Sequence, residues 1–535
     1  MQRVTTRSPH AYPAEDGVDR RRFLGLMSGV AAAAAIAQIP ADRASATPRP
    51  RIDAPFTLGV ASGDPLPNGV VLWTRLAPSP FEPDGGVPTD RRLPIEWQIA
   101  SDARMRRIVR DGVGFAEPRF AHSVHVEVSG LRPGHEYFYR FRYRDQVSQV
   151  GRTRTAPARG LRLRSLDLAF ASCQKWEEGY YPAYRHMAEE DLDVVLHLGD
   201  YVYEYEIPAD GGLRQVDVPA QLQPAPRTLE QWRMRHALTR SDPDLQRVHT
   251  RFPFVCTWDD HEVQNDYANT QSQYEGDISA LRAAAYQAYY EHLPLRAAAI
   301  PRQGRNKLYR RLEFGDLAQF SMLDGRQYRD IPPCGWGEAD ACAAAYEPGV
   351  SMLGETQEQW LERGLTRSRA RWNVLGNNVM MARLDHDGDA GDLLWHDAWD
   401  GFPAARNRIT TTLVDARVRN PVLLTGDWHS TFVNDILLDF DRPESPVVAT
   451  EFVGTSISSN GDAEVYGPYY GPMIGFNPHI KFFDGDRRGY VRCHVDREQW
   501  RTDLRMVTTV STPDAPEYTL ASFVVEDGRP GAHQV

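Results

Sequence analysis

The hydrophobic pattern of the chain changes near residue 160. Beyond this point, short apolar runs alternate with longer segments of helical periodicity. Such runs are typical of strands that are buried on both faces of a largely parallel or mixed sheet, with helices covering the sheet. The predicted strands lie in the stretches LDLAFASCQ, LDVVLHLGDYVY, FPFVCTWDDHE, AQFSMLDGRQY, RWNVLGNNVMM and NPVLLTGDWHS.

Before residue 160 the pattern is that of half-buried strands. The segments GVVLWTRL, LPIEWQIA, HSVHVEVSGL and EYFYRFRYR alternate apolar and polar residues between turn signals. We therefore expect a small β-sandwich over residues 53–157. Within it, LRPGHEYFYRF resembles the fibronectin-type pattern in which a tyrosine near a strand start closes a corner, here Tyr137 or Tyr139. Nothing in this region converges on chemistry, so we assign it a structural role.

Each apolar run after residue 160 ends in a polar or metal-binding residue. These residues are Cys173, Asp200, Asp260, Asp324, Asn377 and Asp427. A single aspartate after a strand is usually a turn residue or a helix cap. In open α/β sheets, however, ligands bind beyond the carboxyl ends of the strands. Six strands that end in this way make coincidence a poor explanation, so we expect a common site.

The stretch LHLGDYVYEY places an acid and three phenols directly after a buried run. The D-x-x-Y spacing lets Asp200 and Tyr203 bend back toward one point once the strand has ended. A phenol binds metal as the phenolate, and its pKa near 10 requires a strong Lewis acid such as ferric iron. The alternative is that Tyr203 is a packing aromatic like Tyr201 and Tyr205. The WDDHE and GDWH stretches elsewhere in the chain favour the metal site.

Residues 1–46 have the pattern of an export signal. They contain adjacent arginines, a weakly apolar stretch from about Leu24 to Ile39, and small residues at Ala44 and Ala46. A membrane anchor is the alternative, but the apolar stretch falls short of the ~20 residues that a spanning helix needs. We expect a twin-arginine signal peptide, export by the twin-arginine machinery, and a secreted or surface-associated mature protein without a stable transmembrane anchor.

Composition narrows the class of partner. The 535 residues, 41% hydrophobic and 25% charged, are typical of a soluble globular protein of two or more domains. The formal net charge is −11, and removal of the six arginines and four acids of residues 1–46 leaves −13. This balance argues against a nucleic acid or an anionic surface as the partner, and we find no nucleic-acid-binding signature.

Five cysteines remain in the mature chain. Cys334 and Cys342, eight residues apart in a segment rich in Gly and Ala, could form a local disulfide in an oxidising compartment. The odd number leaves at least one thiol unpaired or bound to a metal.

Several motifs together resemble one known family. FASCQKWEEGYYPAYRHM, HLGDYVYEY, TWDDHEVQNDYA, LDGRQYRD, WDGFPAAR, LLTGDWHSTFVND, EFVGTSISSNG and NPHIKFFDGDRRGYVRC are similar to the alkaline phosphatase D (PhoD) family of exported metallophosphoesterases. The resemblance covers nearly all of the mature chain. It implies an α-β-β-α layered metallophosphoesterase sandwich over residues 160–525, preceded by the fibronectin- or immunoglobulin-like β-sandwich. The family also contains phosphodiesterases and phospholipases D, which leaves the substrate open.

The resemblance further implies a site with Fe³⁺ and Ca²⁺, related to that of purple acid phosphatases. In this chain the implied iron ligands are Cys173, Tyr203 and His429, with Asp200 bridging the two metals and Asp427 and Asp260 at calcium. The mixture of a soft thiolate, a hard phenolate and carboxylates fits such a site better than a pair of zinc ions.

The remaining implied site residues lie in and beyond the WDDHE stretch. The ordinary metallophosphoesterase pattern is Gly-Asn-His-Glu, from which Asp259-Asp260 departs. His261 is expected beside the phosphate as a catalytic group, with Asn265 a further oxygen ligand. Arg326 could bind phosphate or orient ligands, or it could form a sheet-to-loop ion pair.

Two alternative functions remain open from the sequence. Within the family, the enzyme could be a phospholipase D or phosphodiesterase, so that the substrate is a small phosphate ester or a phospholipid. Outside it, the acids could hold a structural Ca²⁺ in a binding protein without activity. The latter predicts oxygen ligands in one compact loop, whereas the candidate ligands are dispersed along the chain and include Cys, Tyr and His.

Overall fold

All six apolar runs after residue 160 form strands. They are β9 (Leu166–Ala171), β10 (Val194–Leu198), β11 (Pro253–Thr257), β15 (Ala318–Met322), β17 (Trp372–Asn377) and β19 (Pro421–Thr425). The first three pair in parallel in one sheet, and the last three pair in parallel in another. The predicted parallel pairing is therefore confirmed, while the division into two sheets was not visible in the hydrophobic pattern.

The computed structural model describes residues 50–388 and 392–535, and residues 50–535 form one compact unit. The predicted signal peptide, residues 1–46, lies outside the described residues. The larger sheet has ten strands in the order β26 (Arg529–Gln534), β25 (Glu517–Glu526), β24 (Gln499–Val507), β23 (Arg488–Val495), β9, β10, β11, β1 (Val60–Leu66), β2 (Gly69–Arg75) and β5 (Ser123–Ser129).

The second sheet has seven strands. Their order is β14 (Arg310–Phe314), β15, β17, β19, β21 (Val447–Val453), β20 (Thr431–Leu437) and β22 (Ile480–Asp484). Two short antiparallel pairs lie outside these two sheets: β12 (Gln271–Ser272) with β13 (Gly276–Asp277), and β16 (Glu338–Asp340) with β18 (Leu393–Trp395).

The two faces of each central strand contribute to different cores. On β9, Leu168 and Phe170 belong to a core that also contains Phe320, Val374 and other residues of the second sheet. Side chains alternate along a strand, so Ala169 and Ala171 point to the opposite face. Burial on both faces explains why these strands have continuous apolar sequences.

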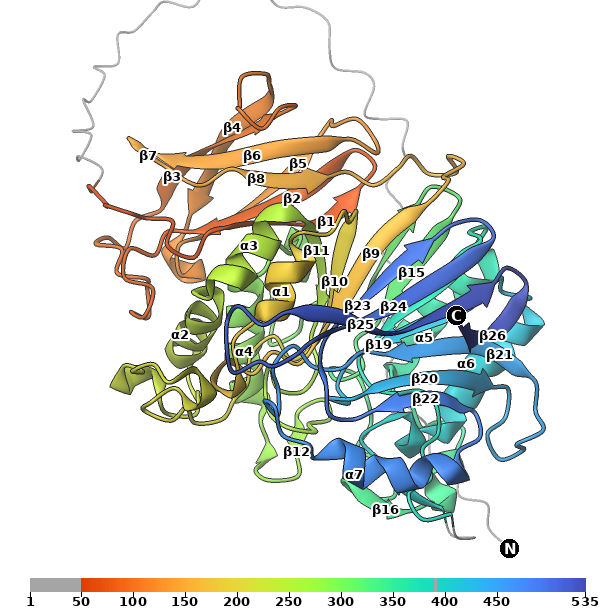
Figure 1. Cartoon of the computed structure of the whole chain (residues 1–535). Coiled ribbons are helices and arrows are strands. Elements are labelled where there is room, and N and C mark those ends of the chain that lie inside the picture. The colour runs from red at the N-terminus through yellow and green to blue at the C-terminus, as the bar shows by residue number, and fades with distance from the viewer. Residues whose placement is uncertain (1–49, 389–391) are drawn as a thin grey trace, which may run out of the picture. The chain divides into compact units, whose positions relative to one another are not determined.

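Helices cover the outer faces of both sheets. The first group is α1 (Pro182–Met187), α2 (Leu229–Arg240), α3 (Pro243–Arg251) and α4 (Ser279–His292), which shares a core with β9, β10 and β11. The second is α5 (Gly354–Arg367) and α6 (Pro403–Asp415), which shares a core with β17 and β19. Figure 1 shows the two groups on opposite sides of the strands. A further short helix, α7 (Tyr466–Tyr470), follows β21. The chain is a mixed α/β protein.

The N-terminal strands do not all stay in a separate sheet. β3 (Leu93–Ala100), β4 (Ile108–Ala116), β6 (Glu136–Tyr143), β7 (Gln146–Val147) and β8 (Gly151–Arg154) form a sheet of their own. β1, β2 and β5 instead continue the ten-stranded sheet, because Ser62 and Gly63 of β1 pair in parallel with Pro253 and Phe254 of β11. Tyr137, not Tyr139, makes the expected corner contact, accepting a hydrogen bond from the Arg132 backbone N–H at 2.9 Å.

Two smaller features complete the fold. Cys334 and Cys342 form a disulfide, whereas Cys173, Cys256 and Cys493 are free thiols. Across the described ranges, 50–388 and 392–535, we find no helix with the length and apolar character needed to cross a bilayer. The domain boundaries at residues 53–157 and 160–525 stay predictions.

We expect Leu168→Ala to lower the free energy of unfolding by about 2–5 kcal/mol, because it leaves a cavity in the core between the sheets. Leu161→Ala is the matched control: this leucine is 52% exposed, so its truncation should cost less than about 0.5 kcal/mol. Urea denaturation of the variants measures both. Equal losses of stability in the two variants would contradict the assignment of Leu168 to the core between the sheets.

Candidate metal centre

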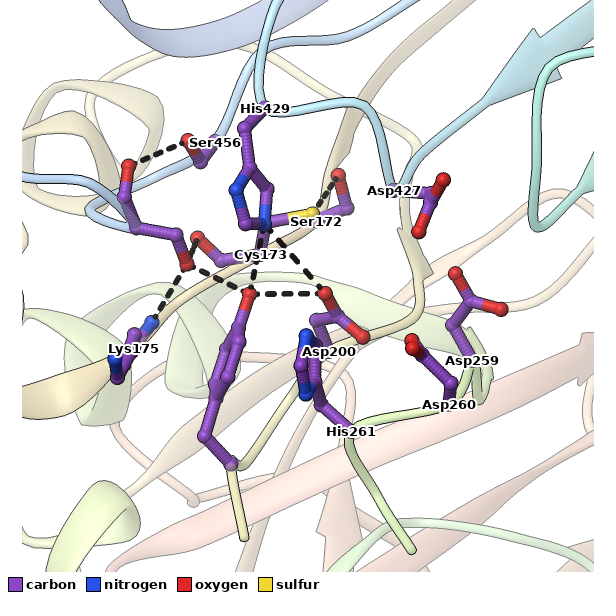
Figure 2. Close-up of polar contacts among 12 residues, drawn as sticks. Ser172, Cys173, Lys175, Asp200, Asp259, Asp260, His261, Asp427, His429 and Ser456 are labelled. Atoms are coloured by element: carbon purple, nitrogen blue, oxygen red, sulfur yellow. Dashed lines mark hydrogen bonds and ion pairs between the residues drawn. The ribbon is translucent and has the colours of Figure 1, made fainter. Parts of the chain in front are cut away.

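The candidate ligands lie where strands of the two sheets end. Cys173 and Asp200 each follow their strands, β9 and β10, by two residues, and Asp260 follows β11 by three. Asp427 follows β19 of the other sheet by two residues. Figure 2 shows the side chains from these four loops turned toward one another. The prediction that strand-end residues gather at one site is therefore correct for these loops.

Glycines allow the loops at this edge to approach closely, both within the ten-stranded sheet and between the two sheets. Gly199 has φ +119°, and a Cβ there would lie 2.4 Å from Asp259 Cβ. A Cβ at Gly426 would lie 3.0 Å from Leu198 O. A larger side chain at either position would push the loops apart, which explains the glycines directly before Asp200 and Asp427.

Left-handed backbone conformations cluster at the same place. Cys173, Asp200, Asp427 and His429 have φ values of 60°, 59°, 67° and 51°. Residues other than glycine adopt this region at a cost, and such strain concentrates at functional sites. Here the conformation turns each side chain inward immediately after its strand.

Four of the predicted ligands meet at one end of the site. Ligand atoms of Cys173, Asp200 and His429 lie within 4.8 Å of one another. The Tyr203 hydroxyl donates to Asp200 Oδ2 at 2.8 Å and lies 3.1 Å from His429 Nε2. A thiol, a phenol, an imidazole and a carboxylate therefore surround one point, as Figure 2 illustrates for the labelled residues.

His429 has the form that a metal ligand requires. Its Nδ1 lies 2.6 Å from Asn460 Oδ1, which accepts the Nδ1 proton. Burial, reinforced by the charge of His261, lowers the pKa of His429 to about 3. The ring is therefore neutral, and its Nε2 lone pair faces Tyr203 and Asp200.

The other end of the site consists of carboxylates. Oxygens of Asp259, Asp260 and Asp427 lie within 4.8 Å of one another, and Asp200, Asp260 and His261 form an overlapping group. Asp200 thus belongs to both ends. Among the described residues, Asp200 Oδ1, Asp259 Oδ2 and Asp260 Oδ1 are buried without a hydrogen-bond partner.

Burial controls the charge of these groups. It raises the pKa of Asp200, Asp259 and Asp427, and neighbouring carboxylates raise it further. At Asp260 burial acts in the same direction, but His261 and Arg326 outweigh it and lower the pKa. Ionisation of Asp200, Asp259 and Asp427 is therefore costly here, and a bound cation would stabilise their ionised forms.

Arg326 is fully buried among the carboxylates. Its Nε donates to Asp259 Oδ1 at 2.5 Å and its Nη1 to Asp397 Oδ1 at 2.7 Å. Its Nη2 lies 3.7 Å from Asp260 Oδ1 and 3.8 Å from Asp427 Oδ1. The structure thus contains the ion-pair arrangement that the sequence offered as an alternative, and a phosphate contact stays a prediction.

His261 and Asn265 lie beside the ligand cluster. His261 Nδ1 is 2.9 Å from Glu204 Oε2, and its ring stacks on Tyr203 at 4.3 Å. Burial alone would lower the pKa of His261, but Asp260, Glu204 and Asp200 raise it well above the usual value. Asn265 is half-buried, and its Oδ1 accepts from the Tyr205 hydroxyl at 3.2 Å. A ligand role for the Asn265 side chain stays a prediction.

Sequence reasoning missed the buried Glu262. Its carboxylate accepts hydrogen bonds from the backbone N–H groups of Asp200, Tyr201 and Asp259 at 2.7–3.1 Å. It therefore ties the loop after β10 to the loop after β11. No spacing rule distinguishes a carboxylate that holds backbone groups from one that binds a metal.

The loop after β21 was also missed as a source of site residues. Ser459 Oγ lies 2.7 Å from the Tyr203 hydroxyl and 2.8 Å from the Cys173 carbonyl oxygen. Asn460 of the same loop orients His429. β21 is another parallel strand that ends in polar residues, so the strand-end rule applied to TEFVGTSISSN would have found this loop.

A separate surface groove lies between α5 and α6. Its volume is about 630 Å³, and Leu361, Leu365, Arg408 and Ile409 are among the residues that line it. None of the predicted site residues lines this groove. The predicted metal ligands lie at the strand ends instead.

Comparison with protein families gives two matches that together cover most of the chain. Residues 168–504 match the family model described as PhoD-like phosphatase. Residues 42–157 match the model described as PhoD-like phosphatase, N-terminal domain.

Individual proteins agree with these matches. Alkaline phosphatase D of Bacillus subtilis (strain 168) is 43% identical over 527 residues, which cover 97% of this chain and 89% of that protein. A solved structure titled "Structure of PhoD" superposes with a TM-score of 0.86 at 44% identity, covering 91% of this chain and 93% of the other.

Proposed function

The chain belongs to the PhoD-like phosphatase family and is a phosphoric ester hydrolase, and we propose that it hydrolyses phosphomonoesters and phosphodiesters with an Fe³⁺/Ca²⁺ site. The observation that carries the proposal is the asymmetry of the cluster. Cys173, Tyr203 and His429 lie at one end and carboxylates at the other, with Asp200 common to both. The two ends suit cations of different chemical character.

The donor set fits these two ions. Iron would be held by Cys173, Tyr203, His429 and Asp200, where a neutral imidazole with a fixed tautomer is already present. Calcium would be held through the carboxylates, whose buried oxygens without hydrogen-bond partners provide hard donors. Asp259, which the sequence left outside the ligands, joins Asp260 and Asp427 in this proposed calcium group.

When bound, the two cations supply Lewis-acid neutralisation of phosphate oxygens and activation of a water molecule. The protein's own contribution is positioning and proton transfer. His261 holds one proton at Nδ1 against Glu204, which leaves its Nε2–H to donate to the substrate. Arg326 acts as a positioning residue, since it fixes the Asp259 carboxylate from a fully buried place.

The alternatives differ in the substrate. A phosphodiesterase or phospholipase D of the same family would use the same ligands with a small diester or a phospholipid. A binding protein with a structural Ca²⁺ is less consistent with these residues, since four separate loops and a thiol contribute to the cluster.

We also propose the finer organisation expected from the sequence. The two facing sheets with helices on their outer faces support an α-β-β-α metallophosphoesterase sandwich over residues 160–525. A fibronectin- or immunoglobulin-like β-sandwich would occupy residues 53–157. The twin-arginine signal at residues 1–46 would direct the protein out of the cytoplasm.

The decisive test measures phosphate ester hydrolysis by the purified holoprotein. We expect release of 4-nitrophenol from 4-nitrophenyl phosphate and from its bis ester, loss of activity in excess chelator, and recovery with Ca²⁺ while iron stays bound. Phosphatidylcholine, assayed alongside, distinguishes the phospholipase D alternative. Full activity in excess chelator would contradict the calcium assignment.

A second prediction concerns Tyr203. If its phenolate binds Fe³⁺, the protein absorbs visible light through ligand-to-metal charge transfer, and Tyr203→Phe shifts or bleaches the band. Tyr201→Phe is the matched control, because that hydroxyl contacts His249 at 2.9 Å instead. Absorption spectra and elemental analysis provide the measurement. An active, colourless protein without iron would refute the ligand set.

A third prediction separates catalysis from metal binding at His261. We expect His261→Ala to retain iron and to reduce kcat by roughly 10²- to 10⁴-fold, the usual contribution of a general acid or base. His494→Ala serves as the control, since its 39% exposed side chain contacts Asp167 on the ten-stranded sheet. Loss of iron from His261→Ala, or near-normal turnover, would show that the residue has another role.

A further inference from the structure

Aromatic rings form a continuous arc past the iron end of the candidate metal centre. Ring centroids are separated by 5.4 Å between Tyr205 and His261, 4.3 Å between His261 and Tyr203, and 6.5 Å between Tyr203 and His429. The arc continues from His429 to Tyr466 at 6.1 Å. Its three inner members are site residues already described, whereas its two ends, Tyr205 and Tyr466, are not predicted ligands.

Tyr466 is held rigidly at one end of the arc. It is half-buried at the start of α7, and its ring stacks on Tyr470 at 5.6 Å with an interplanar angle of 21°. Tyr470 in turn packs against Trp428 at 5.9 Å and Phe432 at 6.1 Å. A ring with this support can bind a ligand without first losing much conformational freedom.

Tyr205 occupies the other end. Its side chain is 40% exposed, and its hydroxyl donates to Asn265 Oδ1 at 3.2 Å, which fixes the ring orientation. Lys175 Nζ lies 4.9 Å from the ring centroid, but Glu178 Oε1 pairs with this ammonium at 2.5 Å. This pairing offsets the ammonium charge beside the Tyr205 ring, which also lies near the ring of His261.

An ester whose phosphate lay at the candidate metal centre would have its organic group within reach of this ring arc. The part of the surface that it meets offers ring faces and edges, which favour planar or apolar groups over small hydrated ones. We propose that Tyr466 and Tyr205 bind the organic group of the ester and select substrates with an aromatic or similarly flat apolar group. The proposal rests on the proposed hydrolysis of phosphoric esters, because it places the phosphate at the candidate metal centre.

Binding of two non-hydrolysable phosphonates to the metal-loaded protein tests this selectivity. Benzylphosphonate and ethylphosphonate share the phosphonate group and differ in the presence of an aromatic ring. We expect the wild type to bind benzylphosphonate more tightly by calorimetry. Tyr466→Ala should reduce the ratio of the two affinities roughly 3- to 10-fold, the contribution of one aromatic contact, and Tyr205→Ala should reduce it in the same direction.

Two controls distinguish ring contact from general damage. Tyr466→Phe keeps the ring and should keep the ratio. Tyr346→Ala should also keep it, because that tyrosine lies outside the ring arc: it is 40% exposed and its hydroxyl contacts Asp441. An unchanged ratio in both Tyr466→Ala and Tyr205→Ala, or equal binding of the two phosphonates by the wild type, would overturn the proposal. Since binding is measured without turnover, loss of selectivity and failure of the proposed hydrolysis are separate outcomes.

Discussion

Repulsion among buried carboxylates is the constraint on which the site depends. Asp200, Asp259, Asp260 and Asp427 converge at the shared edge of two sheets, where little water is available to screen their charge. Arg326 supplies one compensating charge from within the cluster, but several carboxylate oxygens still have no hydrogen-bond partner. Such an arrangement persists in a folded protein only when the rest of the structure enforces it and cations complete it.

The enforcement comes from the fold. Parallel strands direct successive loops to the same edge, and the core between the sheets fixes the distance between the loops of one sheet and those of the other. Glu262 and Ser459 then bind loop backbone and ligand side chains, so that the left-handed conformations at Cys173 and Asp200 are retained. Stability of the cores and precision of the site are therefore linked.

Much of this arrangement could be predicted because strand burial and strand ends leave local signals. The strands within LDLAFASCQ and NPVLLTGDWHS are mostly apolar, since both of their faces are covered, and a polar residue follows each strand. β1 was not recognised, because the Gly, Asp and Pro in VASGDPL interrupt its alternation, although β11 holds it by parallel pairing. Glu262 could not be assigned either, as its partners are backbone groups of loops distant in sequence.

The ten-stranded sheet crosses the boundary between the two predicted domains. β1 covers the edge of β11, whose backbone hydrogen-bonding groups would otherwise be open to pairing with another chain. Three strands of the N-terminal region, β1, β2 and β5, thus extend the sheet whose central strands lead to the candidate metal centre. Removal of this region would leave the backbone groups along that edge of β11 unpaired, two strands from β9, the strand that Cys173 follows.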